Sequence, residues 1–358
     1  MVTLLDCIKR VPSVINSIMN NREKTFQELF QKINDKLDQI NEIILIGSGT
    51  SNTVSITARN FMEKSSGLRT TVLLPNEFTY DLTIRNPNAL YLIISQTGTS
   101  IVVRNCLLFA KEQKFLAAAI CAFRDVPIAQ DAEIFIDMGC GNEEHPTRTI
   151  GYSATVFLLM ILGLELGKKR GYLPDSQYNE YINQASSLSG YLEKGINKTL
   201  IWMDSSKRVM LRSSIIIFTG AGSLYGIALE GAVKVWEIPQ MPSAGYELEE
   251  GIHGPNYGYN HNHCVIVLND GGRENQKAVA LARYMKNEFK TGFIIGNNIV
   301  DEKDLKLEIY DSPFAILVFA SAIQVLAYKL AYDSGRDLMA PHDNRIMYSY
   351  FASHSDYK

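Results

Sequence analysis

The chain has 358 residues, a formal net charge of −3 and 46% hydrophobic residues. This length predicts two domains, each with enough apolar residues for its own core. Acidic and basic residues are mixed throughout the chain, so no basic stripe points to nucleic acid or to an anionic membrane surface. We therefore expect neither nucleic acid nor a membrane as a partner.

The five cysteines are scattered and form no Cys-x-x-Cys pair, which predicts reduced thiols in a cytoplasmic protein. The N-terminus lacks an apolar core followed by a small-residue cleavage site, so we expect no secretory signal. Two apolar runs, Ala154–Gly163 and Phe314–Ala327, are shorter than the roughly 20 residues of a membrane-spanning helix. We expect both to be buried helices.

Residues 11–42 predict a helical segment, because its apolar side chains recur at helical spacing. After it, strand patterns alternate with helix patterns. The expected elements are a strand at 43–47, a helix at 53–65, strands at 70–74 and 90–95, a helix to about 114, strands at 115–121 and 133–137, and an apolar helix after 151. This alternation predicts an α/β fold with a parallel sheet covered on both faces.

The sequence turns polar between Lys168 and Arg212, and a second α/β unit is expected from Ile215 to about Met339. We predict an N-terminal domain over 1–170, with a helical N-terminal extension, and a C-terminal domain over 171–358, with a C-terminal tail. The tail carries Tyr348, Tyr350 and Phe351, which favour docking.

Two stretches of the chain repeat one design. IILIGSGTS (43–51) and IISQTGTS (93–100) form the first copy, and IIIFTGAGS (215–223) and VIVLNDGG (265–272) form the second. Within each copy the glycines lie 49 residues apart, Gly49 with Gly98 and Gly222 with Gly271. The pattern indicates a duplicated α/β unit.

The first copy alone keeps its hydroxyl groups, in the turn 95–100 (SQTGTS) and at Ser51. Ligands of open parallel sheets bind beyond the carboxyl ends of strands, where a turn leading into a helix offers amides to an anion. The second copy has Leu268, Asn269 and Asp270 instead. We therefore expect a phosphate-type ligand in the first half; the alternative is that Ser and Thr only cap the next helix.

The helix after Gly222 carries three charges, Glu230, Lys234 and Glu237, at positions i, i+4 and i+7 of an otherwise apolar segment. They share one face, which we expect to point into a cleft. Glu237 could then move a proton between adjacent carbons while Lys234 keeps it ionised. The alternative is a Glu–Lys pair on a solvated face.

His253 lies in the turn GIHGP (251–255), and a histidine there suits a general acid or base near neutral pH. His261, His263 and Cys264 have the residue types of metal ligands, but they precede a buried strand and have no second cluster nearby. We expect no metal and no cofactor.

The combination resembles the sugar isomerase (SIS) family, and specifically its double-domain members, such as the isomerase half of glucosamine-6-phosphate synthase and the fructosamine-6-phosphate deglycases. The resemblance covers about residues 40–345. Its most specific part is ALEGAVKVWEI (228–238), close to the family's ALEGALKLKEI and followed by His253-Gly254-Pro255. It implies two tandem domains, each a flavodoxin-like three-layer α/β/α fold.

The resemblance also implies residue roles and a homodimer with a shared active site. Glu237 would carry the proton between carbons, His253 would open the sugar ring in the neighbouring subunit's site, and Glu230 and Lys234 would support them. The phosphate would be bound by Ser51, Ser95, Gln96, Thr97 and Ser100, with further substrate contacts from Gly49, Thr50, Gly98 and Arg148.

The chain also departs from the synthase pattern. It begins at Met1 without an amidotransferase segment, so we expect no ammonia source of the synthase kind. Isoleucine 346, in PHDNRI (341–346), stands where the synthase has a Schiff-base lysine, and Arg148 stands where the family's EIGVAST has serine.

These departures predict a deglycase that releases glucose 6-phosphate and an amine from a fructosamine 6-phosphate. The alternatives are a glucosamine-6-phosphate deaminase, an aldose–ketose phosphosugar isomerase, and a non-catalytic sugar-phosphate sensor. Glu247, Glu249 and Glu250 could favour a cationic amine, or could form a solvated acidic turn.

Overall fold

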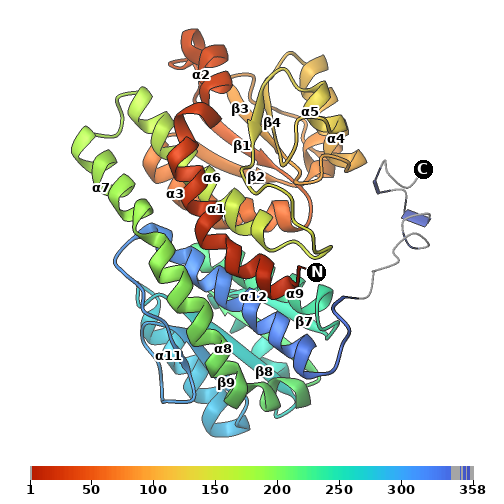
Figure 1. Ribbon diagram of the computed structural model, residues 1–358, viewed down its shortest axis with the longest axis vertical. Helices are drawn as coiled ribbons and strands as arrows, with labels where there is room; N and C mark the ends of the chain where they lie inside the picture. The colour runs from red at the N-terminus through yellow and green to blue at the C-terminus, as the bar shows by residue number, and fades with distance from the viewer. Residues whose placement is uncertain (1, 340–346, 348–349, 352, 355–358) are drawn as a thin grey trace. The chain divides into compact units, whose positions relative to one another are not determined.

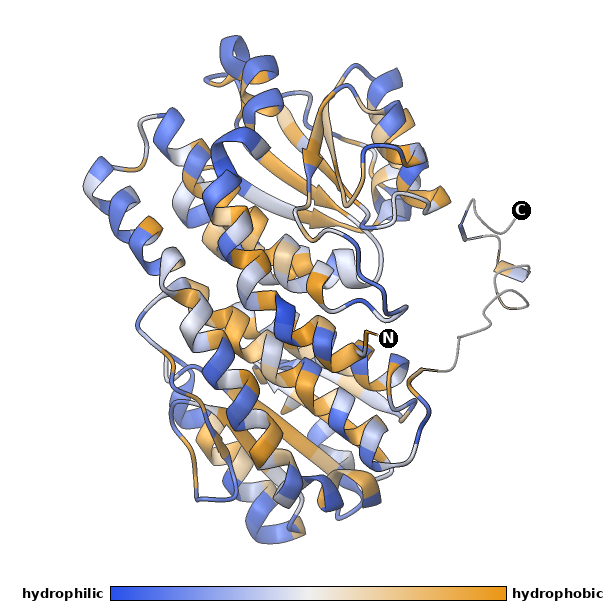
Figure 2. Ribbon diagram, viewed as in Figure 1, coloured by the Kyte–Doolittle hydropathy of each residue, from blue (hydrophilic) through white to orange (hydrophobic). Residues whose placement is uncertain are grey.

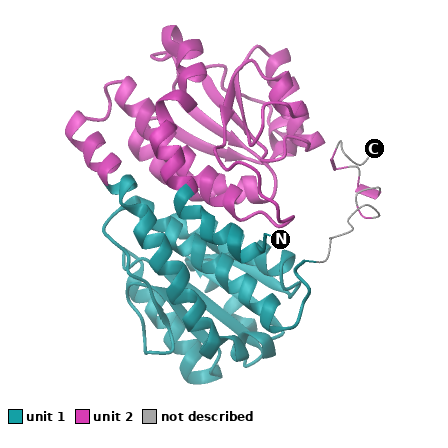
Figure 3. Cartoon of the chain, viewed as in Figure 1, with its two compact units in different colours: residues 1–13, 184–340 teal, residues 14–183, 341–358 magenta. Residues whose placement is uncertain are grey.

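The computed structural model describes residues 2–339, 347, 350–351 and 353–354. The chain divides into two compact units, coloured in Figure 3. The N-terminal unit comprises residues 14–183 and 341–358, and the C-terminal unit comprises 1–13 and 184–340. The division falls after residue 183 rather than at 170, inside a helix, so no loop marks it in the sequence.

The elements up to this division follow one another along the red-to-green part of the chain in Figure 1, where most of them are labelled. They are α1 (Leu4–Thr25), α2 (Gln27–Ile33), η1 (Asn34–Lys36), β1 (Glu42–Ile46), α3 (Thr50–Ser66), β2 (Arg69–Leu73), η2 (Glu77–Asp81), β3 (Ala89–Ile94), α4 (Ile101–Glu112), β4 (Leu116–Cys121), α5 (Pro127–Asp131), β5 (Phe135–Asp137), α6 (Ile150–Lys169) and α7 (Asp175–Ser186). The helical segment expected over 11–42 is therefore α1, α2 and η1, with α1 starting earlier than expected.

The C-terminal unit repeats the alternation of strands and helices. Its elements are α8 (Leu188–Arg212), β6 (Ile215–Gly220), α9 (Ser223–Glu237), β7 (Ser243–Glu247), α10 (Leu248–Gly251), η3 (Pro255–Gly258), β8 (His263–Asn269), α11 (Asn275–Tyr284), η4 (Met285–Phe289), β9 (Gly292–Gly296), β10 (Leu305–Lys306), η5 (Pro313–Ala315) and α12 (Ile316–Asp333).

Both units contain a parallel five-stranded sheet with the same strand order. The sheets run β2-β1-β3-β4-β5 and β10-β9-β8-β6-β7. In each unit the chain starts at an inner strand, adds one strand on one side of it, and then crosses over to add the other three strands on the other side. All strand pairs are parallel. This order is the flavodoxin-like one, and the switch point lies between β1 and β3 in one unit and between β6 and β8 in the other. The expected duplicated α/β fold is confirmed.

Helices cover both faces of each sheet. In the N-terminal unit, alternate residues of β1, β3 and β4 pack against α4 and α5, and the opposite face is covered by α3 and α6. In the C-terminal unit α11 covers one face, while α9 packs on the other together with α12. Figure 2 shows the strands as predominantly hydrophobic, as expected of sheets buried on both faces.

The two longest apolar helices form part of these cores. The segments Ile150–Lys169 and Pro313–Asp333 could each cross a membrane by length and composition, but 100% and 83% of their apolar windows are buried inside the structure. Such burial is typical of core helices, as the sequence predicts. Glycines let α6 approach α3 closely: a Cβ at Gly167 would lie only 1.9 Å from the carbonyl oxygen of Ser65.

All five cysteines are buried and free. Burial raises the pKa of the thiols of Cys121 and Cys140 to about 12. These thiols therefore stay protonated at neutral pH and are poor nucleophiles.

Candidate functional site

The turn predicted to bind an anion, residues 95–100, lies at the switch point of the N-terminal sheet. It follows β3, which pairs with β1 in parallel register, Ile46 opposite Ile93. The turn after β1 therefore lies beside it. Ser51 packs so closely against that turn that a Cβ at Gly47 would lie 2.6 Å from the Ser51 Cβ. The fold thus brings Ser51 to the same sheet edge as the anion turn.

Two glycines give this edge its shape. Gly49 is the N-cap of α3, immediately before Thr50, and has φ 57°, and Gly98 has φ 64°, both in the region that favours glycine. A Cβ at Gly98 would also lie 2.1 Å from the Val126 side chain. Neither position readily accepts a larger residue, so the glycines predicted to contact the substrate shape the backbone first.

The hydroxyl groups of the anion turn are only partly used inside the protein. Ser100 is the N-cap of α4, yet within the described residues its side chain makes no capping hydrogen bond. Ser95 Oγ accepts a hydrogen bond from the Gly98 amide at 3.2 Å, and Thr97 Oγ1 accepts one from Thr99 Oγ1 at 3.1 Å. Simple helix capping therefore does not account for Ser100, and a helix N-terminus with neutral donors is suited to a phosphate.

The side chains of Gln96 and Arg148 both meet the loop before α6. Gln96 Nε2 donates to Glu143 Oε2 at 3.1 Å. Arg148 Nη1 donates to the main-chain carbonyls of Glu143 (2.8 Å) and His145 (3.4 Å). Arg148 thus orders its own loop, whereas the resemblance implies a substrate contact. Glu143 is not among the site residues predicted from the sequence.

Two described tail residues also reach the anion turn. The Ile101 amide donates to the Ser353 carbonyl at 3.1 Å, and Thr99 Oγ1 lies 3.3 Å from His354 Nδ1. The expected docking therefore involves later residues than the aromatic ones: Tyr350 and Phe351 are exposed, and Tyr348 and residues 341–346 lie outside the described residues.

The three charged residues of α9 form a chain of ion pairs. Lys234 Nζ lies 3.3 Å from Glu230 Oε1 and 2.6 Å from Glu237 Oε2. Glu230 and Lys234 are fully buried, whereas 43% of the Glu237 side chain is exposed. The solvated-face alternative is therefore excluded. Of the three side chains, Glu237 is the one exposed to a ligand. Glu230 and Lys234 are buried beneath it and do not line an open cleft, contrary to the expectation that all three point into one.

The charge of Lys234 is maintained by its neighbours. Burial alone would lower the pKa of its ammonium, but the carboxylates of Glu230 and Glu237 outweigh this effect and raise that pKa. This ammonium donates to Glu237 Oε2 at 2.6 Å and thereby fixes the position of the carboxylate.

His253 lies at the other end of α9. Its Nδ1 is 2.9 Å from the Glu249 carbonyl, and 66% of its side chain is exposed. Glu249 lines the same cavity as Gly222, which precedes α9, whereas Glu237 is the last residue of α9. The helix rises about 21 Å between these two ends. A single chain therefore does not bring Glu237 and His253 together on one sugar.

The acidic turn after β7 is largely engaged inside the protein. Glu247 caps α10 by accepting hydrogen bonds from the amides of Glu249 and Glu250, and Glu249 forms an ion pair with Lys277. The hydrogen bond from Lys277 holds the pKa of Glu249 below its usual value. Of the three acidic residues expected to favour a cationic amine, Glu247 and Glu249 are half-buried and Glu250 is exposed.

The switch point of the C-terminal unit is a cavity of about 660 Å³ with different chemistry. Gly222 repeats the backbone of Gly49, with φ 60° and ψ −126° against 57° and −126°. The counterparts of Ser51 and Thr97, however, are Leu224 and Asp270, and both line the cavity. The Asp270 carboxylate disfavours an anion beside it, although Arg273 and Lys277 also line this cavity, so the two switch points differ in chemistry.

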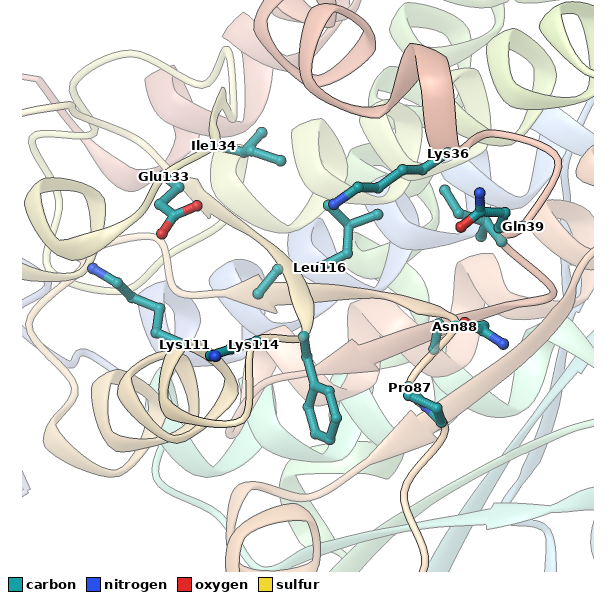
Figure 4. Close-up of a pocket in the computed structure, with 13 residues that line it drawn as sticks. Lys36, Gln39, Pro87, Asn88, Lys111, Lys114, Leu116, Glu133 and Ile134 are labelled. Atoms are coloured by element: carbon teal, nitrogen blue, oxygen red, sulfur yellow. The ribbon is translucent and has the colours of Figure 1, made fainter.

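A separate cavity of about 330 Å³ lies at the opposite edge of the N-terminal sheet, at the starts of β3 and β4. Lys36, Lys111 and Lys114 line it together with Glu133, and Figure 4 shows Lys36 extending toward the middle of the cavity. None of the site residues predicted from the sequence lines it. Within the described ranges, no group of three or more His, Cys, Asp and Glu side chains could hold a metal ion.

Comparisons with known proteins identify the family of this fold. The family model of the SIS domain matches residues 36–164 and 210–331. A glutamine–fructose-6-phosphate aminotransferase (isomerizing) of Xanthomonas campestris is 26% identical over 314 residues, which are 86% of this chain and 51% of that protein. The chain spans about half the length of the curated relatives it matches.

Two solved structures have the same fold over nearly the whole chain. One is described as a phosphosugar isomerase of Clostridium difficile 630, with a TM-score of 0.90, 25% identity and 99% of each chain covered. The other is the C-terminal domain of glucosamine-fructose-6-phosphate aminotransferase from Francisella tularensis, with a TM-score of 0.85, 20% identity, and 94% of this chain and 98% of that one covered.

Proposed function

This chain belongs to the SIS domain family, and on that premise we propose that it is a phosphosugar-processing enzyme that needs no cofactor, a deglycase of fructosamine 6-phosphates. Its products would be glucose 6-phosphate and a free amine. The substrate phosphate would bind at the anion turn, through the hydroxyls of Ser51, Ser95, Thr97 and Ser100 and the amides at the start of α4. That contact fixes one end of the sugar and orients the other.

Glu237 would move the proton. Its carboxylate takes a proton from C1 of the open-chain ketosamine, which gives an enaminol, and returns it to C2, which gives the C1 imine of the aldose. Water then adds to the imine carbon, and the C1–N bond breaks with transfer of a proton to nitrogen. The sum is ketosamine 6-phosphate plus water to glucose 6-phosphate plus amine, with no oxidant and no metal required.

The observation that carries this proposal is the asymmetric exposure of the α9 ion pairs. Glu237 is partly open to ligands, while the Lys234 ammonium, which donates to it at 2.6 Å, is buried together with Glu230. A surface ion pair would not need a second, fully buried carboxylate behind the lysine. The arrangement suits a carboxylate that must keep one position through each proton transfer.

His253 would open the sugar ring, as the resemblance implies. His253 lies at the far end of α9 from Glu237 of the same chain. The His253 that opens the ring would therefore come from a second copy of the chain in a homodimer. Its side chain is 66% exposed, so the imidazole is accessible from outside its own unit.

The choice of a deglycase over an isomerising synthase is supported by the tail sequence. Ile346, which lies outside the described residues, cannot form the imine that a lysine would form with a ketose. A substrate that already carries nitrogen needs no such imine. The deaminase alternative uses the same Glu237 and differs only in releasing ammonia from glucosamine 6-phosphate.

The test is turnover by the full chain on a panel of fructosamine 6-phosphates with different amines, beside glucosamine 6-phosphate and fructose 6-phosphate. We expect equal amounts of glucose 6-phosphate and amine from at least one ketosamine, and a loss on the order of 10²–10⁴-fold for Glu237→Gln. Glu193→Gln, the same change at an exposed position on α8, is the control and should keep full activity.

Other outcomes of the panel would overturn the proposal in distinct ways. Ammonia from glucosamine 6-phosphate alone would identify a deaminase, and interconversion of fructose and glucose 6-phosphates alone would identify an isomerase. Binding of sugar phosphate without turnover of any member would identify a sensor. Wild-type activity in Glu237→Gln would remove the role given to that carboxylate.

A further inference from the structure

Glu143 is a buried carboxylate that neither the sequence reading nor the proposed mechanism uses. It lies in the loop between β5 and α6 and is almost completely excluded from solvent. A buried carboxylate is costly unless its oxygens accept hydrogen bonds. The donors around Glu143 therefore indicate what the residue does.

One oxygen of Glu143 caps α6. Oε1 accepts hydrogen bonds from the Thr149 amide at 2.5 Å, the Thr149 hydroxyl at 2.8 Å and the Ile150 amide at 2.9 Å. Thr149 is the N-cap of α6, but its hydroxyl donates to Glu143 instead of capping the helix itself. The negative charge also lies at the positive end of the helix dipole.

The other oxygen points to the anion turn. Oε2 accepts hydrogen bonds from Gln96 Nε2 at 3.1 Å and from the Gly151 amide at 3.2 Å. Gln96 is also held from a second side, because a Cβ at Gly151 would lie 1.9 Å from Gln96 Oε1. The Gln96 amide group is thus clamped between a carboxylate and a bare glycine, and its main-chain carbonyl accepts from Ala122.

Helix capping alone does not explain this clamp. The cap uses the amides of Thr149, Ile150 and Gly151, and none of these contacts requires Oε2 to accept from the Gln96 side chain as well. Gln96 also packs where a side chain at 151 would lie. The second copy provides a comparison. The Gln96 counterpart is Asn269, whose side-chain amide donates to Asn275 Oδ1 at 2.9 Å and to the Asn298 carbonyl at 3.1 Å, which are neighbours within its own unit.

The start of the counterpart of α6 also differs in that copy. α12 follows the short helix η5, which the Ser312 hydroxyl caps by accepting from the Phe314 amide at 3.2 Å, so a serine rather than a carboxylate caps the helix that leads into α12. The carboxylate clamp therefore accompanies the copy that kept its hydroxyl groups, as expected if it serves the anion turn.

From these contacts we infer that Glu143 is a positioning residue for phosphate binding. It does not touch the substrate, because protein donors occupy both of its oxygens. It fixes Gln96, and with it the start of the turn that carries Thr97, Gly98 and Ser100. Ligand affinity at the turn therefore depends on a residue 47 positions further along the chain. This inference rests on the proposed phosphate site, not on the identity of the reaction.

The test measures the affinity of the full chain for glucose 6-phosphate by calorimetry, with unfolding by urea measured separately. Glu143→Gln replaces an acceptor with a donor that faces Gln96, and we expect an affinity loss of about tenfold. Thr149→Val is the matched control. It removes one hydrogen bond of the same cap without touching Gln96, and it should lower stability while changing the affinity by less than about twofold.

A second comparison asks whether Glu143 acts through Gln96. In a Gln96→Ala background, Glu143→Gln should cost less than about twofold further, because the partner is already absent. If the Glu143 variant does not fold, Gly151→Ala, which displaces Gln96 Oε1 from the other side, should give the same affinity loss as expected for Glu143→Gln.

Three results would overturn the inference. They are a folded Glu143→Gln protein with wild-type affinity, an equal affinity loss for Glu143→Gln with and without Gln96, and an affinity loss for Thr149→Val as large as that for Glu143→Gln. Absence of glucose 6-phosphate binding to the wild-type chain would instead refute the proposed phosphate site, so the two failures are distinguishable.

Discussion

Replacing Lys234 with methionine should destabilise the C-terminal unit strongly. Lys234 is fully buried, and its ammonium lies 3.3 Å from the Glu230 carboxylate, which is also fully buried. Methionine fills much of the same volume without the charge. Glu230 would then remain as a buried carboxylate without the ammonium that compensates it. Breaking a buried pair by removing one partner costs about 3–5 kcal/mol, and we expect a loss of unfolding free energy in that range.

A double variant separates the charge effect from packing. In Lys234→Met/Glu230→Leu both buried charges are gone and apolar side chains of similar size remain. Replacement of a buried pair in this way is often neutral or stabilising by about 1–4 kcal/mol. We therefore expect the double variant to regain most of the lost stability. Activity should not return, because the double variant still lacks the Lys234 ammonium, whose Nζ donates a hydrogen bond of 2.6 Å to Glu237 Oε2.

Tryptophan fluorescence suits this measurement. The chain has two tryptophans, Trp202 on α8 and Trp236 on α9, and both belong to the C-terminal unit. Their signal during urea unfolding therefore follows the unit that contains Lys234. A loss below about 1 kcal/mol for Lys234→Met would refute the argument, since it would place the pair in effectively solvated surroundings. Failure of the Glu230→Leu change to restore stability would show that packing, not the uncompensated charge, causes the loss.

Two further predictions follow from the geometry. Burial raises the pKa of four tyrosines to about 12 in the folded chain, whereas the unfolded chain loses the same protons near the ordinary pKa of 10. The free energy of unfolding should therefore fall as the pH rises from 10 to 12, as measured by urea unfolding at each pH. A flat profile would contradict the burial of these tyrosines. These tyrosines are Tyr91, Tyr178, Tyr259 and Tyr310. Ser51→Leu, which installs the residue found at the equivalent position 224, should weaken glucose 6-phosphate binding by about tenfold or more, whereas Ser214→Leu, at an exposed serine, should leave the calorimetric affinity unchanged.

The fold was predictable from the sequence because both sheets are buried on both faces. Continuous apolar runs then mark the central strands, as at Ile43–Ile46 and Val265–Leu268, and glycines mark the turns that follow them. That signal is weak at the edge strands of the C-terminal unit, which the sequence does not mark one by one. β10 has only two residues, and β7 (SAGYE) mixes small and polar residues and has a mostly half-buried pattern.

The site residues were predictable where side-chain types contrast with their surroundings, and not where contacts join distant segments. Three charges on the apolar α9 are visible in one stretch of sequence. That Glu230 and Lys234 are buried while Glu237 is exposed depends on how α12 and β7 pack on α9, which no local pattern records. The Glu143 clamp joins residues 47 positions apart, and the only local signal in the sequence is a glycine at 151, in the first turn of α6.

The two switch points have the same backbone conformation, as expected of a duplicated unit, but carry different side chains. Gly49 and Gly222 have nearly identical dihedral angles, so the helix N-termini that follow them offer similar amides. An anion that only required those amides would bind both units. Asp270, in place of Thr97, adds a negative charge at the second switch point, and Leu224, in place of Ser51, removes a donor. For the proposed phosphate ligand we expect selectivity between the copies to reside in side chains carried on a similar backbone, and exchange of those side chains should transfer phosphate affinity from one unit to the other.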